Sequence, residues 1–208
     1  MTERKIFYFA KISGSFSVTY MLLAGIAINS LAGASIGFLT YLSDDEQLRS
    51  LVFWTMGNLS GAIWPEVIIT GTITIPALVV LIKNSAKLNL LLLGDDNASY
   101  LGVDIIKLKK IIIICCSLLV GSAVSVSGVI GFVGLVVPHL VRLSLGSDHR
   151  LLFPASALLG ASLLLIADTL ARSVVSPAEM PVGILTSIIG APFFLLLIIK
   201  QNTKRFGL

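Results

Sequence analysis

The stretch from residue 111 to residue 140 holds 30 residues without a single Asp, Glu, Lys or Arg. Across the whole chain 12% of residues are charged and 56% are hydrophobic, whereas a soluble domain carries about 25% charged residues. So little charge leaves too little polar surface to coat a water-soluble globule. Helices satisfy their own backbone hydrogen bonds in lipid. The sequence therefore predicts an all-α, polytopic transmembrane helical bundle.

About six apolar spans are expected, near residues 17–42, 61–82, 105–127, 131–145, 151–172 and 181–200. A transmembrane helix needs about 20 apolar residues, so the stretch 111–140 is long for one span and short for two. Gly128, Gly131 and Gly134 crowd its middle and Pro138 follows. This pattern predicts one full helix and then one short, irregular span. We expect residues 1–208 to form a single transmembrane domain.

The basic residues lie at the ends of the apolar runs and form no continuous stripe, which argues against nucleic acid as a partner. Six spans place both ends of the chain on one side of the bilayer. Thirteen of the 15 Lys and Arg residues then fall on that side, and Arg49 and Arg172 fall on the other. By the positive-inside rule we expect a multi-pass protein with both termini in the cytoplasm.

The first apolar run carries a stripe of small or amide residues, because Gly25, Asn29, Gly33 and Gly37 recur every four positions and share one helix face. Small residues at this spacing let a second backbone approach closely. Tight helix packing is the favoured interpretation, and a face that lines a substrate path is the alternative.

The connection 90–104 combines apolar residues with Asp95, Asp96 and Asn97. Gly94 can end the preceding helix, and one of the three polar residues can cap a short helix over 98–101. Apolar residues in such a connection suggest a docking surface for a soluble partner. A compact loop packed against its own bundle explains them equally well.

Asp168 and Arg172 lie one helical turn apart, a spacing typical of an ion pair within one helix. His139 is expected to be a hydrogen-bonding group near a helix end, because no second His or Cys lies at metal-ligand spacing.

The chain has no G-x-x-x-x-G-K-[ST] loop, so it lacks that device for ATP hydrolysis, and no catalytic motif or cofactor site is evident. An intramembrane enzyme using Asp168 or His139 is disfavoured, since the two lie toward opposite membrane faces.

Several ordered segments resemble the FecCD family, the permease subunits of ABC importers for iron siderophores, heme and vitamin B12. The strongest matches are GVIGFVGLVVPHLVRLSLGSDHRLLFPASALLGASLLLIADTLAR over 128–172 and AEMPVGILTSIIGAPFFLLLI over 178–198. LLAGIAINS and LLLGDDNASYLGV match in order and spacing, so the resemblance covers residues 17–200. It implies a type II ABC importer permease-like fold in the bacterial inner membrane, without enzymatic activity of its own.

The resemblance also implies partners: an ABC ATPase subunit, a periplasmic substrate-binding protein and a second permease copy in a homodimer. Residues 90–104 match the cytoplasmic coupling loop, and the residues expected to contact the ATPase are Leu93, Gly94, Asp95, Asp96, Ala98, Leu101 and Gly102. Arg172 corresponds to an arginine that meets the binding protein. The translocation path is expected to include Gly25, Asn29, Gly33, Gly37, Thr186 and Ser187.

The segment 44–64 is closer to hemin permeases than to vitamin B12 permeases, so heme or an iron siderophore is the expected substrate. The chain begins where the fifth helix of the family should begin, and about four N-terminal spans are expected to be lacking. A truncated, non-transporting remnant of a permease is therefore the alternative function.

Overall fold

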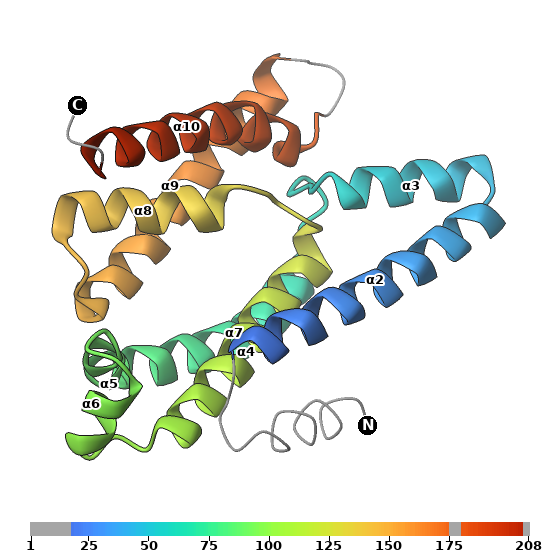
Figure 1. Ribbon diagram of the computed structural model, residues 1–208. Helices are drawn as coiled ribbons and strands as arrows, with labels where there is room; N and C mark the ends of the chain where they lie inside the picture. The colour runs from blue at the N-terminus through green and yellow to red at the C-terminus, as the bar shows by residue number, and fades with distance from the viewer. Residues whose placement is uncertain (1–17, 175–179, 206–208) are drawn as a thin grey trace. The chain divides into compact units, whose positions relative to one another are not determined.

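The computed structural model describes residues 18–174 and 180–205, and every regular element among them is an α-helix (Figure 1). The chain divides into two compact units, Met1–Leu51 and Val52–Leu208. The expected all-α fold is confirmed. The helices are α2 (Val18–Leu42), α3 (Asp45–Thr55), α4 (Trp64–Lys83), α5 (Ser85–Leu91), α6 (Asp95–Tyr100), α7 (Ile105–Ser127), α8 (Val133–Leu145), α9 (His149–Val174) and α10 (Val182–Arg205).

Four stretches within these helices are long and apolar enough to cross a bilayer: Leu22–Leu42, Trp64–Lys83, Ile105–Ser127 and His149–Val174. Val133–Leu145 and Val182–Leu196 are shorter apolar helices. The six predicted apolar runs therefore all become helices, and the shortest of these is α8 with 13 residues. Between these runs lie α3 and α5, where the sequence suggested only connections.

The charge-free stretch breaks where its glycines cluster. Helix α7 ends at Ser127, and Gly128 then adopts φ = +68°, a left-handed conformation that glycine reaches without a Cβ clash. Helix α8 begins only at Val133, after Phe132 at φ = +65°. The prediction of one full helix followed by a short span is confirmed.

The first unit consists of α2 and most of α3. Its apolar side chains are mostly exposed, as expected for a helix that has lipid or another protein as its neighbour. Asp44 precedes α3, and its carboxylate accepts a hydrogen bond from the Gln47 backbone N–H at 2.9 Å. This bond satisfies one of the free donors at the beginning of the helix.

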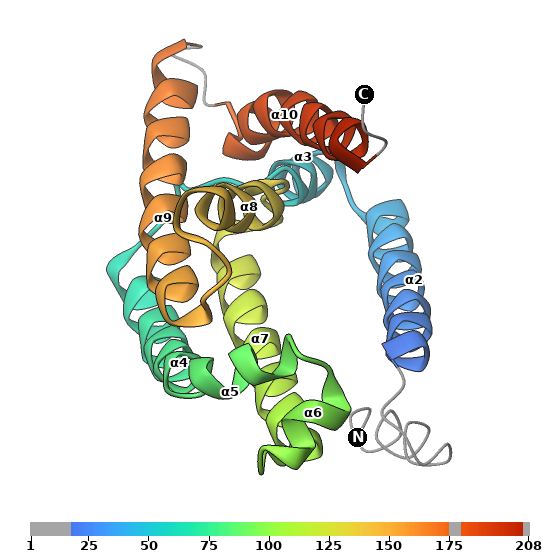
Figure 2. The same ribbon diagram turned by 60° about the vertical axis from the view of Figure 1, so that its left-hand side comes forward.

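The second unit contains two groups of packed helices, which Figure 2 shows from a second side. Helices α4 and α7 pack along each other around Ala77, Leu81 and Cys115. Helices α8, α9 and α10 pack mutually, with Ala167 and Ala171 on α9 buried beside Val182. Small side chains at these contacts bring the helix backbones close together, which is how helices associate in lipid.

A glycine junction joins three distant segments of the second unit. It consists of Gly57 after α3, Gly128 after α7 and Gly183 at the beginning of α10. A Cβ added at Gly183 would lie 1.9 Å from the Met56 carbonyl oxygen, and one at Gly128 would lie 2.0 Å from the Trp54 oxygen. The Asn58 backbone N–H also donates to the Ser127 carbonyl at 2.9 Å. Only glycine leaves room for backbones this close.

Replacing Gly183 with Ala is expected to destabilise the second unit, because the new methyl group must displace the backbone at Met56. Overpacking of this kind costs about 1–3 kcal/mol. Thermal unfolding in detergent measures the loss. Gly134→Ala is the matched control, since a Cβ there meets no atom within 4 Å. If both variants melt at the wild-type temperature, the junction is not a stabilising contact.

Candidate functional site

The α5–α6 segment, residues 85–104, is held in shape by two left-handed glycines. Gly94 adopts φ = +97°, and its N–H donates to the Leu91 carbonyl at 3.0 Å, which reverses the chain after α5. Helix α6 begins at Asp95 without a side-chain cap. The expected capping by Asp95, Asp96 or Asn97 is therefore wrong, because Gly94 occupies the N-cap position and all three side chains lie inside the helix.

The end of α6 forms a Schellman turn around Gly102, which adopts φ = +84°. The Gly102 N–H donates to the Ser99 carbonyl at 2.9 Å, and the Val103 N–H donates to the Ala98 carbonyl at 3.1 Å. Ala98 is completely buried and packs with Val103 and Leu108. The side of the segment that carries Ala98 thus packs against the chain's own helices.

The other side of the segment exposes large apolar side chains. Leu93 is 58% exposed, Leu101 59% and Tyr100 90%. Tyr100 was not among the expected site residues, although it follows the buried Ala98 by two positions and so falls on the outer face of α6. Exposed apolar residues on a rigid support are typical of a protein-binding surface.

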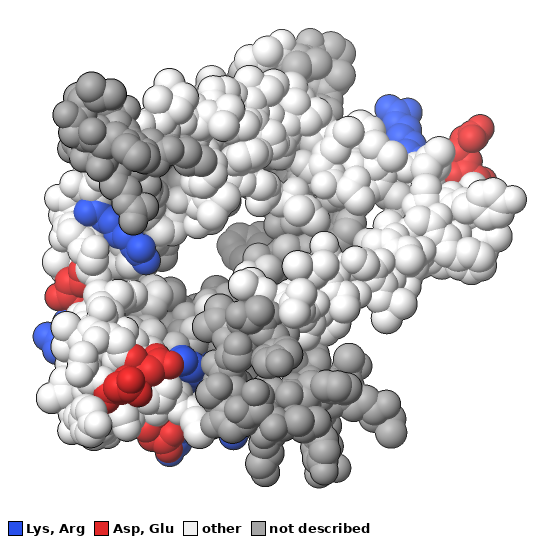
Figure 3. Space-filling view, in the orientation of Figure 1, with Lys and Arg blue, Asp and Glu red and all other residues white. Residues whose placement is uncertain are grey.

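The charges of the segment have different surroundings. Asp95 forms an ion pair with Lys109 on α7, which ties α6 to the next helix. Asp96 is exposed. In Figure 3 acidic and basic residues gather over the α5–α6 segment and the α8–α9 turn. The exposed side of the segment is therefore an apolar patch beside charged residues.

Asn89 on α5 reaches the beginning of α9, a contact that the sequence did not reveal. Its Nδ2 donates to Asp148 Oδ1 at 2.6 Å, and its Oδ1 accepts from the His149 backbone N–H at 2.9 Å. His149 Nδ1 lies 2.7 Å from the same oxygen. Asp148 also accepts from the Arg150 backbone N–H at 2.9 Å. The Arg150 bond, followed by the Asn89 bond, lowers the pKa of Asp148, so this carboxylate stays ionised at neutral pH.

Arg172 donates from Nε to Asp168 Oδ2 at 2.8 Å, so the predicted ion pair within α9 is confirmed. The Arg172 side chain remains about half exposed, whereas that of Asp168 is mostly covered. The carboxylate holds one edge of the guanidinium, and the terminal nitrogens remain as potential donors. A half-exposed, oriented arginine is suited to bind an external carboxylate.

The expected path residues fall in both units. Gly25, Asn29, Gly33 and Gly37 form an exposed stripe on α2 in the first unit. Thr186 and Ser187 lie on α10 in the second unit. Thr186 is buried, and its hydroxyl donates to the Gly183 carbonyl at 3.2 Å.

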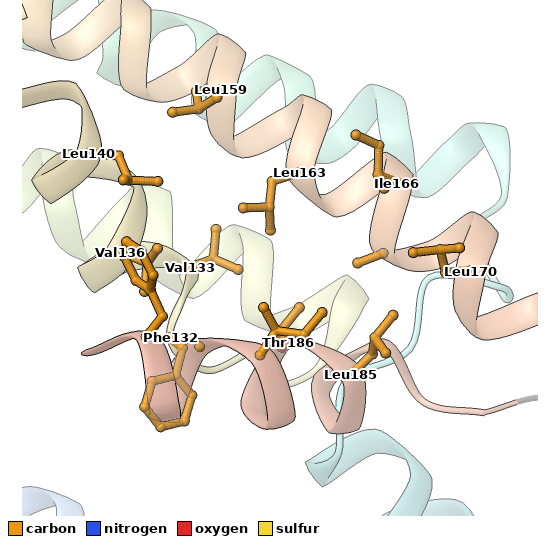
Figure 4. Close-up of a pocket in the computed structure, with 14 residues that line it drawn as sticks. Phe132, Val133, Val136, Leu140, Leu159, Leu163, Ile166, Leu170, Leu185 and Thr186 are labelled. Carbon is orange, nitrogen blue, oxygen red and sulfur yellow. The ribbon is translucent and has the colours of Figure 1, made fainter. Parts of the chain in front are cut away.

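Thr186 lines an apolar cavity of about 350 Å³ between α8, α9 and α10 (Figure 4). In Figure 4 Leu159, Leu163 and Ile166 extend from α9 toward the two other helices. At one end the helices touch closely, since a Cβ added at Gly190 would lie 2.4 Å from the Phe132 Cβ. The described side chains that line the cavity are all uncharged.

His139 is half-buried on α8, and no described contact joins it to Asp168. Cys115 is buried and Cys116 exposed, and both are free thiols. Among residues 18–174 and 180–205 no three His, Cys, Asp or Glu side chains converge on a possible metal position. The described part of the chain therefore presents surfaces and a cavity as its candidate functional features.

Comparison with known proteins identifies the family. The profile of the FecCD transport family matches residues 5–200. The hemin transport system permease protein HmuU of Yersinia pestis is 52% identical over 194 residues, which are 93% of this chain and 58% of that protein. The vitamin B12 import system permease protein BtuC of Vibrio vulnificus is 43% identical over 186 residues, 89% of this chain and 56% of that protein.

A solved structure described as the inward-facing conformation of a metal-chelate type ABC transporter superposes with a TM-score of 0.86 at 37% identity. The match covers 95% of this chain and 63% of that one. The chain thus spans less than two thirds of the length of each of these relatives. Its helices, their order and its sequence agree with those of ABC permeases, and the chain belongs to the FecCD transport family.

Proposed function

We propose that this chain is a permease subunit of an ATP-driven ABC importer for heme or an iron chelate in the bacterial inner membrane. The observation that carries the proposal is the α5–α6 segment, where Leu93, Tyr100 and Leu101 are exposed on a frame fixed by buried Ala98. Membership of the FecCD transport family supports this reading over a loop that only packs on its own bundle.

The exposed side of the segment would bind a separate ATPase subunit. Gly94 and Gly102 fix its turns, and Ala98 anchors it from within. Asp95 is engaged by Lys109, so its role is to hold α6 in place. Asp96 remains exposed and is available to a basic group of the partner. ATP hydrolysis belongs to that partner, and this chain is not the enzyme.

The proposed orientation has the α5–α6 segment and both termini in the cytoplasm. Thirteen of 15 basic residues then lie on the cytoplasmic side. The contact of Asn89 with Asp148 supports this arrangement. It requires the connection between α4 and α7 and the connection between α8 and α9 to lie at the same end of the bundle. The same arrangement puts Arg172 on the periplasmic side, where a substrate-binding protein delivers its cargo.

The proposed path runs between two copies of the permease. The exposed stripe on α2 is suited to face a second copy, because Gly25, Gly33 and Gly37 allow a close backbone approach. Thr186 and Ser187 on α10 would contribute further small polar groups. ATP binding and hydrolysis would push on the α5–α6 segment and rock the helices between outward-open and inward-open states. The substrate would pass with no covalent chemistry.

The double variant Leu93→Asp and Leu101→Asp is expected to weaken co-purification with the ATPase subunit of the same importer. Two charges placed in an apolar interface should reduce affinity at least about tenfold, or about 1.4 kcal/mol. Ile63→Asp is the control, because it changes an exposed apolar residue in a different connection. Undiminished ATPase binding by the double variant, with the control also binding, would argue against the docking role.

Proteoliposomes that contain this chain, its ATPase and its binding protein are expected to take up hemin in an ATP-dependent way. Cobalamin at equal concentration should not reduce the hemin uptake. The sequence of residues 44–64 and the 52% identity to a hemin permease both favour heme as the substrate. Scintillation counting of iron-labelled hemin measures the uptake. Cobalamin uptake would overturn the substrate assignment, and ATPase binding without any uptake would favour a non-transporting remnant.

Arg172→Glu is expected to reduce binding-protein affinity by about tenfold or more, because it places a carboxylate where the partner is expected to present another. Asp168→Asn is the matched variant. It keeps the Arg172 charge and should change affinity by about twofold or less. Surface plasmon resonance at low and high salt measures both. Equal affinity of Arg172→Glu and wild type at low salt would exclude Arg172 from the docking surface.

A further inference from the structure

We infer that Asn89 is a positioning residue that transmits movement of the α5–α6 segment to the base of α9. This inference rests on the proposed function, since it concerns how docking on that segment reaches the helices around the cavity. Figures 1 and 2 both place α5 against the beginning of α9. The two elements are 59 to 60 residues apart in the sequence at their contact.

Asn89 uses both ends of its amide group in this contact. Nδ2 donates to the Asp148 carboxylate, and Oδ1 accepts from the His149 backbone N–H and faces His149 Nδ1. An amide that binds a donor on one side and an acceptor on the other is fixed in orientation as well as position. The hydrogen bonds described between α5 or α6 and the beginning of α9 are all made by this one side chain.

The first turn of α9 depends on hydrogen bonds from outside the helix, such as those of Asn89. Pro154 lies inside the helix and has no N–H to donate to the Arg150 carbonyl, so the first turn is joined less firmly to the rest of α9. Asp148 closes that turn through the Arg150 N–H. Asn89 binds the capping carboxylate and the first backbone N–H of the helix together. A displacement of α5 therefore pulls on the turn itself.

The base of α9 leads to the helices around the cavity. His149 contacts the Phe153 ring, with 5.8 Å between centroids, and Phe153 packs on the α4–α7 core of Ala77, Leu81 and Cys115. Farther along, α9 lines the cavity with α8 and α10. Tilting the first turn of α9 thus changes contacts with both helix groups of the second unit. The Asn89 contact is the polar link at the beginning of this route.

A reciprocal exchange of side chains tests the link. Asn89→Asp places two carboxylates against each other and removes the amide donor, so the contact should be lost. Adding Asp148→Asn restores the pair with the roles exchanged, since residue 148 now supplies the amide donor and residue 89 the carboxylate acceptor. Asparagine is also a good helix cap, so the beginning of α9 keeps its cap. Asn89→Ala removes the link without adding charge. A residue with a merely local structural role would not be rescued by the exchange.

The structural readout is the distance between spin labels at Leu92 and Leu151, both of which are exposed, in a background with Cys115 and Cys116 replaced by Ala. Pulsed electron paramagnetic resonance should give a narrow distribution for the wild-type pair. Asn89→Ala and Asn89→Asp should broaden it, and the double exchange should narrow it again. A narrow distribution in Asn89→Ala would overturn the link, whether or not the chain binds an ATPase.

The functional readout is ATP hydrolysis in the assembled transporter with and without the loaded binding protein. Asn89→Ala should keep ATPase co-purification but lose stimulation at least about fivefold, and the double exchange should recover it. If Asn89→Ala broadens the spin-label distance distribution but leaves the stimulation of ATP hydrolysis unchanged, the transmitting role is overturned. Failure of the unmodified chain to bind an ATPase would instead overturn the proposed function, and the transmitting role with it.

Discussion

Close backbone contact at glycine is the interaction on which the second unit depends. In lipid, burying a leucine between helices gains little over leaving it against acyl chains, so association relies on packing and hydrogen bonds. Gly57, Gly128 and Gly183 supply both, because they bring the segment after α3, the α7–α8 connection and the beginning of α10 within hydrogen-bonding reach. The cavity and the α5–α6 segment are both positioned by helices that this junction joins.

The apolar runs, the break after Ser127 and the Asp168–Arg172 pair could be predicted because each depends on residues close in sequence. Span length and helical spacing are local properties. Helical spacing would also have predicted that Tyr100 lies on the outer face of α6. The side chains of Asp95 and Asp96 show the limit of local rules. A residue suited to cap a helix fits equally well in its first turn, where Asp95 forms an ion pair with Lys109 on the next helix.

The contact of Asn89 with Asp148 and His149 could not be predicted in the same way. Nothing in the residues near Asn89 distinguishes it from other polar residues at a helix end, and its partners lie in a different connection. The neighbours of Gly183 are even farther away in the sequence, since a Cβ added at Gly183 would meet the Met56 carbonyl oxygen. Such contacts follow only when the helices have been placed in three dimensions. They are also the contacts that give the bundle its specific arrangement.

The close contact between Phe132 and Gly190 restricts how α10 can slide along α8. The left-handed Phe132 is fixed at the beginning of α8, and its Cβ occupies the space that a side chain at position 190 would need. Sliding α10 along its axis by one residue turns its facing side chain by about 100°, which replaces Gly190 by a residue with a Cβ. Screw-like sliding of α10 is therefore sterically blocked. Any movement of α10 along α8 must therefore first separate Gly190 from Phe132, which lie together at one end of the cavity.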